Sequence, residues 1–274
     1  MTITPTAEGL IAARYGETDT VGYSAPFNKT LAVLYGHRSI RSFTGANIDE
    51  PTIAALIAAG QSAATSSNFQ SWSVIEIRDP SHKDRIASLS GDQDFIRQAP
   101  VFLVFVADWA RNRLIAERHG SPTEGINYID TTFVGFVDAA LAAQNTVIAA
   151  ESLGLGTVYV GAVRNHAEKL SKALELPPSA FPVVGLALGY PDASATGGIK
   201  PRLPQDIVRH RERYTQPTDE AVARYDQRIA AYYASQDQPR GWVESVLRRV
   251  RDRASLHGRD RIRDALRRRG FPSL

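Results

Sequence analysis

The stretch Pro100-Val101-Phe102-Leu103-Val104-Phe105-Val106-Ala107 is apolar at every position. An uninterrupted apolar run of strand length predicts a central strand that is buried on both faces of a sheet. Three further stretches are rich in β-branched or apolar residues and predict its companions. They cover residues 73–78, 157–160 and 183–190.

Helical patterns lie between these strands. Residues 49–51, Asp-Glu-Pro, are favourable for a helix start, and apolar residues follow at helical spacing. Residues 131–152 are apolar nearly all round, which predicts a buried helix, and Asp138 is one of the polar residues that argue against a membrane span. Other helices are expected over residues 81–99, 168–174 and the last sixty residues.

The chain has 274 residues, of which 43% are hydrophobic and 22% charged, as in ordinary globular proteins. We find no internal repeat and no clean linker, so we expect one domain over residues 27–274. Residues 1–26 show little periodicity and are expected to form a loosely held, poorly structured extension. The N-terminus lacks the pattern of a secretory signal, so a cytoplasmic location is expected.

Two segments are unusually polar for their surroundings. Residues 108–129 lose apolar periodicity and are expected to form an exposed helical excursion that covers a site. Residues 240–270 contain eleven arginines and four acids, a net charge of +7 in a chain whose total is +3. This tail could contact nucleic acid or an acidic ligand, although the interleaved acids favour a solvated helix or a packing arm.

The stretch Gly36-His37-Arg38-Ser39-Ile40-Arg41-Ser42-Phe43 combines guanidinium, imidazole and hydroxyl groups. Arginine forks onto phosphate oxygens, and serine with backbone N–H groups can complete such a cradle, but a solvated surface is the alternative. Lys200 and Arg202 follow a glycine pair and form a second basic segment. A phosphate-bearing cofactor that performs the chemistry itself would explain both segments.

The sequence lacks the residues that several common kinds of functional site require. The chain has no cysteine, which excludes disulfides, iron–sulfur clusters and thiolate zinc sites. The histidines are scattered without metal-ligand spacing, so no metal site is expected. No Gly-x-Ser-x-Gly or Walker A motif occurs. The glycines at 154 and 156 follow a helix and open a strand, the reverse of a dinucleotide fingerprint.

Four motifs stand in the order seen in FMN-dependent nitroreductases. They are His37-Arg38-Ser39-Ile40-Arg41, the polar loop 65–72, the segment 149–161 that ends in Gly-Thr-Val-Tyr-Val-Gly, and Gly189-Tyr190-Pro191 followed by Lys200-Pro201-Arg202-Leu203-Pro204. The chain most resembles the oxygen-insensitive NADPH nitroreductase and flavin reductase P group, from about residue 30 to the C-terminus.

This resemblance implies an α+β fold with a mostly antiparallel central sheet flanked by helices, in an intertwined homodimer. The sheet would be joined by a strand from the partner, and residues 215–274 would form an arm around the partner. Two FMN molecules would sit at the dimer interface. By position in the motifs, the cofactor-binding residues would be His37, Arg38, Ser39, Arg41, Ser67, Gln70, Gln93, Tyr159, Gly161, Ala162, Lys200 and Arg202.

The implied reaction is ping-pong. NADPH or NADH would reduce FMN, and a nitroaromatic, quinone or flavin would then take up the electrons, with no catalytic side chain required. Ala162 stands where the family usually has a second glycine, and Gln236 stands where an arginine would hold the 2′-phosphate of NADPH. Arg240 is the candidate replacement. The alternatives are a flavin reductase or reductive dehalogenase of the same fold, or a nucleic-acid-binding regulator that uses the Arg-rich tail.

Overall fold

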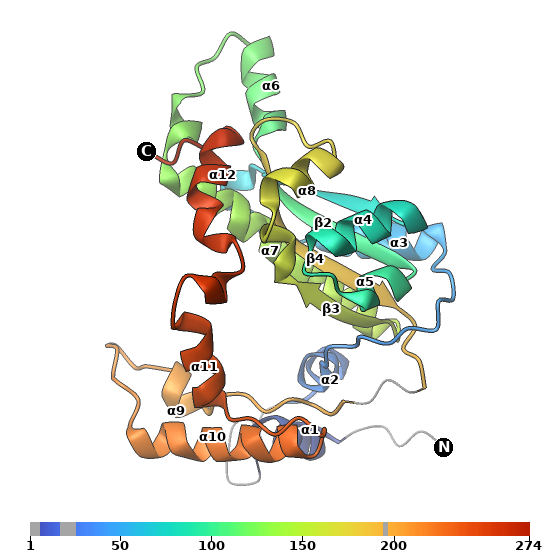
Figure 1. Ribbon diagram of the computed structural model, residues 1–274, viewed down its shortest axis with the longest axis vertical. Coiled ribbons are helices and arrows are strands. Elements are labelled where there is room, and N and C mark those ends of the chain that lie inside the picture. The colour runs from blue at the N-terminus through green and yellow to red at the C-terminus, as the bar shows by residue number, and fades with distance from the viewer. Residues whose placement is uncertain (1–5, 17–25, 194–196) are drawn as a thin grey trace. The chain divides into compact units, whose positions relative to one another are not determined.

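The computed structural model describes residues 6–16, 26–193 and 197–274 (Figure 1). The described residues form two compact units. The first comprises the residues up to Arg38 together with 197–255, and the second comprises Ser39 to residue 193 together with Leu256–Leu274. The boundary between them falls inside the basic motif, between Arg38 and Ser39.

The second unit is built on a four-stranded antiparallel sheet, which confirms the expected sheet. Its strands are β1 (Trp72–Ile77), β2 (Val101–Asp108), β3 (Gly156–Val160) and β4 (Ala180–Gly189), in the order β1-β2-β4-β3. Every pair of neighbours is antiparallel. The central position of β2 and the burial of all its apolar side chains confirm the prediction from its sequence.

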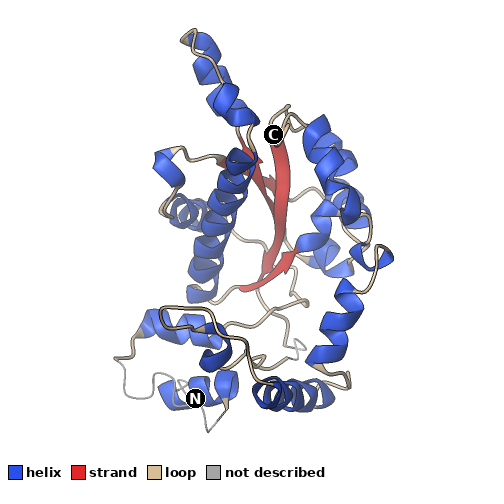
Figure 2. Cartoon of the chain, turned by 90° about the vertical axis from the view of Figure 1, so that its left-hand side faces the viewer, coloured by secondary structure: helices blue, strands red, loops and turns tan. Residues whose placement is uncertain are grey.

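Helices cover both faces of this sheet, which Figure 2 shows edge-on. Leu103 and Phe105 of β2 point to a core shared with α3 (Glu50–Gln61) and α7 (Ile129–Ser152). Phe102 and Val104 point to the opposite core. The helices on that second face are α4 (Pro80–Leu89), α5 (Asp94–Gln98) and α8 (Ala167–Ala173). Since side chains alternate along a strand, a strand between two helical layers must be apolar throughout.

Side-chain caps set where two of these helices begin. The Asp49 carboxylate accepts a hydrogen bond from the N–H of Thr52 at 2.9 Å, and Asp79 accepts one from the N–H of His82 at 2.7 Å. Each cap satisfies an N–H that the helix itself cannot pair, and a proline follows each in the first turn.

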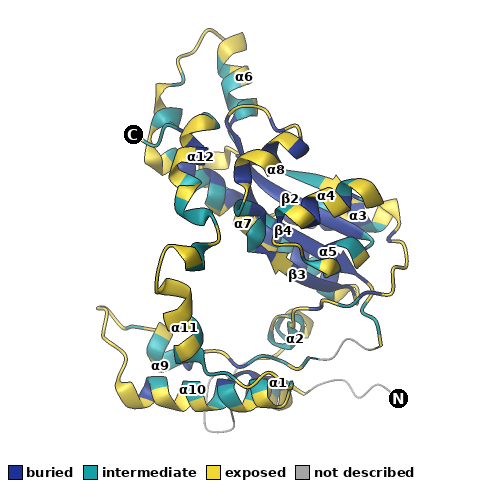
Figure 3. Cartoon of the chain, in the orientation of Figure 1, coloured by how far each residue is buried: buried dark blue, intermediate teal, exposed yellow. Residues whose placement is uncertain are grey.

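The prediction that α7 is buried all round is wrong. One face packs on the sheet, but Phe133, Val137 and Leu141 are 61%, 54% and 42% exposed and form a stripe at i, i+4 and i+8. Figure 3 shows this helix partly buried and partly exposed beside the mostly buried strands β2 and β4. Among the described helices, α7 alone is long and apolar enough to cross a membrane, and its buried face assigns it to the core of this unit.

The C-terminal segment packs on the core of its own chain. Phe271 is fully buried, and its ring centroid lies 6.2 Å from that of Phe181. The backbone of Leu274 pairs with that of Asn127, and α12 (Ile262–Arg268) joins the same core. The end of the expected 215–274 arm therefore belongs to the second unit of this chain.

The first unit is helical. Its members are α1 (Ala7–Tyr15), α2 (Lys29–Gly36), α9 (Gln205–Val208), α10 (Asp219–Ala234) and α11 (Trp242–Val250). The expectation that residues 1–26 are poorly structured is wrong for α1, whose Leu10 and Ile11 are buried; residues 1–5 and 17–25 lie outside the described residues. The remaining short elements are α6 (Ala110–Arg118), η1 (Ser66–Asn68), η2 (Glu124–Asn127), η3 (Gly161–Arg164), η4 (Ala254–Leu256) and η5 (Arg259–Arg261).

Candidate functional site

In the second unit, the end of the basic motif is attached to the edge strand β3. The N–H of Ile40 donates to the carbonyl of Thr157 at 2.9 Å, and the Ile40 side chain is buried. A Cβ on Gly156 would lie 2.8 Å from the Cβ of Ile40, so only glycine permits this approach. Ser39 and Arg41 are thereby held beside β3, where the predicted Tyr159 also lies.

The residues that follow β3 lie near Gln93, another predicted cofactor residue. Gly161 and Ala162 open η3 directly after the strand. A Cβ built on Gly91 would lie 3.5 Å from the Cβ of Ala162 and 3.8 Å from Nε2 of Gln93, so these side chains surround one point. Gln93 is oriented by a 2.8 Å hydrogen bond from its Nε2 to the carbonyl of Ser90.

Tyr159 stands on β3 and is 37% exposed. Its hydroxyl donates to Oε1 of Gln144 on α7 at 3.4 Å. Partial burial, and after it the negative charge of Glu151, raise the pKa of the Tyr159 hydroxyl above its usual range. The side chain is therefore a neutral hydrogen-bonding group at physiological pH.

The polar loop 65–72 has an unusual backbone. Ser67, Asn68 and Gln70 have φ angles of 46°, 55° and 49°, the left-handed region that non-glycine residues rarely occupy. Such a conformation persists only where the surroundings impose it. Ser67 and Gln70 are the predicted cofactor residues of this loop. Contacts with other parts of the fold must therefore maintain their backbone conformation.

Asp138 of α7 holds this loop. Its carboxylate accepts hydrogen bonds from the N–H of Ser66 at 3.1 Å, the N–H of Ser71 at 3.2 Å and Oγ of Ser71 at 2.9 Å. Asp138 and Ser71 are buried. The sequence analysis missed this role, although an acid in the middle of an apolar helix signals a buried polar partner.

The excursion after β2 reaches the same loop. Nη2 of Arg111, at the start of α6, donates to the carbonyl of Gln70 at 2.6 Å and to that of Trp72 at 3.0 Å. No residue of α6 is buried. The exposed helix expected within residues 108–129 is therefore present, and its first turn fixes the backbone beside Gln70.

In the first unit, one buried arginine joins the two predicted basic segments. Arg14 of α1 donates from Nη1 to the carbonyl of Lys200 at 2.8 Å and from Nη2 to the carbonyl of His37 at 2.6 Å. The N–H of Arg202 donates to the carbonyl of Arg14 at 2.9 Å. Nη1 of Arg38 donates to the carbonyl of Gly197 at 3.1 Å. The structure thus brings His37 and Arg38 together with Lys200 and Arg202.

Arg240 lies close to Lys200. The Arg240 guanidinium stacks 4.0 Å from the ring centroid of Tyr233, and Nζ of Lys200 lies 5.2 Å from the same centroid. Burial by itself raises the pKa of the Tyr233 hydroxyl, but hydrogen bonding and positive charge from Lys200, and then from Arg240, outweigh it and hold that pKa below its usual range. Arg240, the candidate residue for the coenzyme, and Lys200, a predicted FMN residue, therefore both contact Tyr233.

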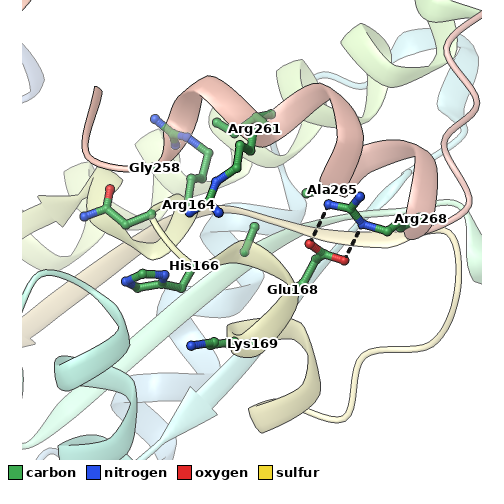
Figure 4. A pocket seen from close by; sticks show the side chains of 11 residues that line it. Arg164, His166, Glu168, Lys169, Gly258, Arg261, Ala265 and Arg268 are labelled. Atoms are coloured by element: carbon green, nitrogen blue, oxygen red, sulfur yellow. Dashed lines mark hydrogen bonds and ion pairs between the residues drawn. The ribbon is translucent and has the colours of Figure 1, made fainter. Parts of the chain in front are cut away.

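A pocket lies between α8 and α12 in the second unit (Figure 4). Its lining includes the cationic or imidazole side chains of Arg164, His166, Lys169 and Arg261. Arg268, which also lines the pocket, forms a bidentate pair with Glu168 at 2.7 and 2.9 Å. The sequence analysis missed this pocket because its residues come from segments about ninety positions apart. Among the described residues, no group of three or more His, Asp and Glu could hold a metal ion.

Comparison with known proteins identifies the family. Residues 34–190 match the Nitroreductase family, and residues 200–273 match the Nitroreductase family, C-terminal domain. An FMN reductase [NAD(P)H] of Bacillus subtilis is 39% identical over 254 residues, covering 89% of this chain and 98% of that protein. An oxygen-insensitive NADPH nitroreductase of Salmonella typhimurium is 40% identical over 205 residues, covering 74% and 82%.

The fold agrees with this match. The solved NADPH:FMN oxidoreductase from Vibrio harveyi, complexed with NAD+, superposes with a TM-score of 0.81 at 32% identity, over 90% of this chain and all of that one. The family matches together cover most of the chain, and the motif residues that carried the resemblance lie within them. The chain belongs to the nitroreductase family.

Proposed function

We propose that this chain is an NAD(P)H-dependent oxidoreductase that holds FMN as its working cofactor. The observation that carries this proposal is the convergence of two basic segments in the first unit. His37 and Lys200 are linked through the Arg14 guanidinium, Arg202 is linked to the Arg14 carbonyl, and Arg38 is linked to the carbonyl of Gly197. Relatives that share more than a third of the sequence are an FMN reductase and an NADPH nitroreductase, which supports the same activity.

The donor set fits the phosphate and ribityl end of FMN. Arg38, Lys200 and Arg202 supply permanent positive charge, and phosphate is bound most strongly by charge-assisted hydrogen bonds from such groups. Tyr225 and Tyr232 of α10 donate to the carbonyls of Pro201 and Gly198 at 3.1 and 3.0 Å, so the basic segment is preorganised. We assign His37, Arg38, Ser39, Arg41, Lys200 and Arg202 to this end of the cofactor.

A second group suits the flavin ring. Gln93 offers an amide, Tyr159 a neutral hydroxyl, and Gly161 with Ala162 a surface without bulky side chains. Ser67 and Gln70 sit in the strained loop that Asp138 fixes. We assign these six residues to the ring, where fixed N–H and amide dipoles stabilise negative charge as it develops.

FMN, when bound, would accept hydride from a nicotinamide and pass electrons to an acceptor. The chain itself then needs to bind the flavin, orient the substrates and exclude water. Nitroaromatics, quinones and free flavins are the acceptors we propose. The Tyr159 hydroxyl, which stays protonated, and the amide of Gln93 are placed to orient polar groups beside the ring. A flavin reductase or reductive dehalogenase activity would use the same groups, and acceptor screening separates the three.

Coenzyme selection has two candidate sites. Arg240 stacks on Tyr233, and its Nε is buried without a hydrogen-bond partner, so we propose its guanidinium for the 2′-phosphate. The pocket between α8 and α12 offers Arg261 and Lys169 in the other unit. Replacing Arg240 or Arg261 by methionine separates them, because only the variant that loses the phosphate contact raises the KM for NADPH while leaving that for NADH unchanged.

We propose a cytoplasmic homodimer. The exposed apolar stripe of α7 and the exposed Val246, Leu247 and Val250 of α11 suit burial against a second copy. The Arg-rich tail is better explained as a packing element than as a nucleic-acid surface, because Arg268 pairs with Glu168 and Arg269 donates to the carbonyls of Leu176 and Pro177.

The activity is tested by steady-state kinetics of the FMN-loaded protein with NADPH and NADH against a nitroaromatic, a quinone and free FMN. Parallel initial-rate lines in the double-reciprocal plot are expected for a ping-pong reaction. A protein that is saturated with FMN and oxidises neither coenzyme would contradict the proposal.

A further inference from the structure

We infer that α1 stabilises the phosphate end of the flavin site. In this inference Arg14 is a positioning residue, which holds the two segments that bind the phosphate. The inference rests on the proposed assignment of His37, Arg38, Lys200 and Arg202 to the FMN phosphate. The family match begins at residue 34, so α1 precedes the part of the chain that the family shares.

Arg14 is placed as a structural cation inside the first unit. Its side chain is only 4% exposed, and it donates to three backbone carbonyls: Lys200 at 2.8 Å, Tyr35 at 2.9 Å and His37 at 2.6 Å. Burying a guanidinium is costly unless its donors are satisfied, and here carbonyls from two distant segments satisfy them. One side chain therefore sets the spacing between His37 and Lys200.

The backbone of Arg14 adds a further link. Its carbonyl accepts the N–H of Arg202 at 2.9 Å, so a single residue contacts both basic segments through side chain and main chain. Arg228 of α10 donates to the carbonyl of Tyr15, the next residue of α1. Leu10 and Ile11 are buried, and Leu10 lies against Gly36 of α2. The helix is held in place on both sides of Arg14.

The charge of Arg14 has a second effect. Tyr35 and His37 are at the C-terminal end of α2, where the last carbonyls of a helix are unpaired and carry partial negative charge. An anion bound by the residues that follow would be repelled by these carbonyls. A guanidinium that hydrogen-bonds to two of them offsets that repulsion, so Arg14 favours phosphate binding without touching the phosphate.

The predicted consequence is specific to phosphate. Removing Arg14 should loosen the segments that hold the FMN phosphate and leave the groups of the second unit intact. FMN affinity should fall while affinity for riboflavin, which lacks the phosphate, should not. A general loss of folding would weaken both ligands together.

The experiment compares Arg14→Met with Arg14→Lys in the full-length chain, with FMN and riboflavin dissociation constants measured by flavin fluorescence. We expect Arg14→Met to weaken FMN at least about tenfold, equivalent to about 1.4 kcal/mol, with riboflavin unchanged. Arg14→Lys keeps the charge but cannot reach three carbonyls, so its FMN affinity should lie between those of the wild type and Arg14→Met.

The matched control is Arg113→Met. Arg113 is a partly buried arginine that donates to Ser179, Thr123 and Asn127 and contacts none of the assigned cofactor residues. It should lose stability without changing the FMN to riboflavin ratio. Equal affinities of Arg14→Met and wild type for FMN would overturn the inference about Arg14. An equal loss of affinity for FMN and riboflavin would overturn it too. A wild type that binds riboflavin as tightly as FMN would instead refute the proposed phosphate site.

Discussion

Asp138 and Ser71 are joined twice, because one carboxylate oxygen accepts both the N–H of Ser71 at 3.2 Å and its Oγ at 2.9 Å. The other oxygen accepts the N–H of Ser66, so the carboxylate spans the base of the strained loop. This buried acid links the long core helix to Ser67 and Gln70, whose conformation the loop alone would not keep.

Replacing Asp138 by alanine should leave the two buried donors of Ser71 and the partly buried N–H of Ser66 unpaired. We expect a loss of about 3 kcal/mol in the free energy of unfolding and weaker flavin binding, since each unsatisfied buried group costs about 1–3 kcal/mol. Urea unfolding and FMN titration measure the two effects. The control is Asp130→Asn on an exposed turn of the same helix, which should stay within about 0.5 kcal/mol of wild type. Equal stability of the Asp138 variant would contradict its role.

Replacing Gly156 by alanine should displace the basic motif. The added Cβ would meet three atoms of the Ile40 side chain at 2.8–2.9 Å, and relief of this contact must disturb the hydrogen bond from Ile40 to Thr157. Overpacking of this kind costs about 1–3 kcal/mol of stability, and FMN affinity should fall with it. Gly125→Ala is the control, because no atom lies within 4 Å of its added Cβ. Thermal unfolding that is the same for both variants would show that the motif tolerates the clash.

The Tyr233 hydroxyl should lose its proton at a lower pH than an ordinary tyrosine does. Its pKa in the folded state lies below the unfolded value of about 10, so the folded protein releases this proton first as pH rises. The resulting stabilisation is complete above the unfolded pKa and is lost as pH falls through the folded pKa. The difference between the tyrosinate absorbance titrations of wild type and Tyr233→Phe should therefore have a midpoint below about 10. Lys200→Ala should raise that midpoint, and a midpoint above 10 in wild type would refute the cation cluster.

Charging the exposed stripe of α7 should dissociate the proposed dimer. Phe133→Glu and Val137→Glu place carboxylates on residues that are 61% and 54% exposed in the single chain, so folding of the chain is spared. Burial of those charges in an interface would be strongly unfavourable. Sedimentation analysis should give the dimer mass for wild type and for Leu114→Glu, an exposed position on α6, and the monomer mass for the two stripe variants. A stripe variant that remains dimeric would place the interface elsewhere.

The strands could be predicted because their signal is local. Residues 100–107 are apolar on both faces, and β2 is covered by helices on both faces. The helix start at Asp49 was equally local, since a cap needs only the next three residues. For α7 the local pattern was insufficient, because apolar residues all round a helix do not tell a core face from an exposed stripe.

The site residues were predicted from resemblance, whereas the residues that hold them were not. Asp138 contacts segments 67 and 72 positions away, and Arg14 contacts Lys200 across 186 positions. Hydrogen bonds of this range depend on the finished fold, and no spacing within the sequence indicates them. The expectation of a poorly structured extension was wrong at α1 for the same reason, because its stability comes from tertiary contacts.

The central claim is that this chain binds FMN and reduces it with a nicotinamide coenzyme. The most direct measurement is an anaerobic titration of the purified, FMN-reconstituted protein with NADPH and with NADH, followed by visible absorbance. The account predicts stoichiometric FMN that survives gel filtration and loses its visible absorbance on addition of coenzyme. A colourless protein that cannot be reconstituted with FMN, or a bound flavin that neither coenzyme reduces, would contradict it.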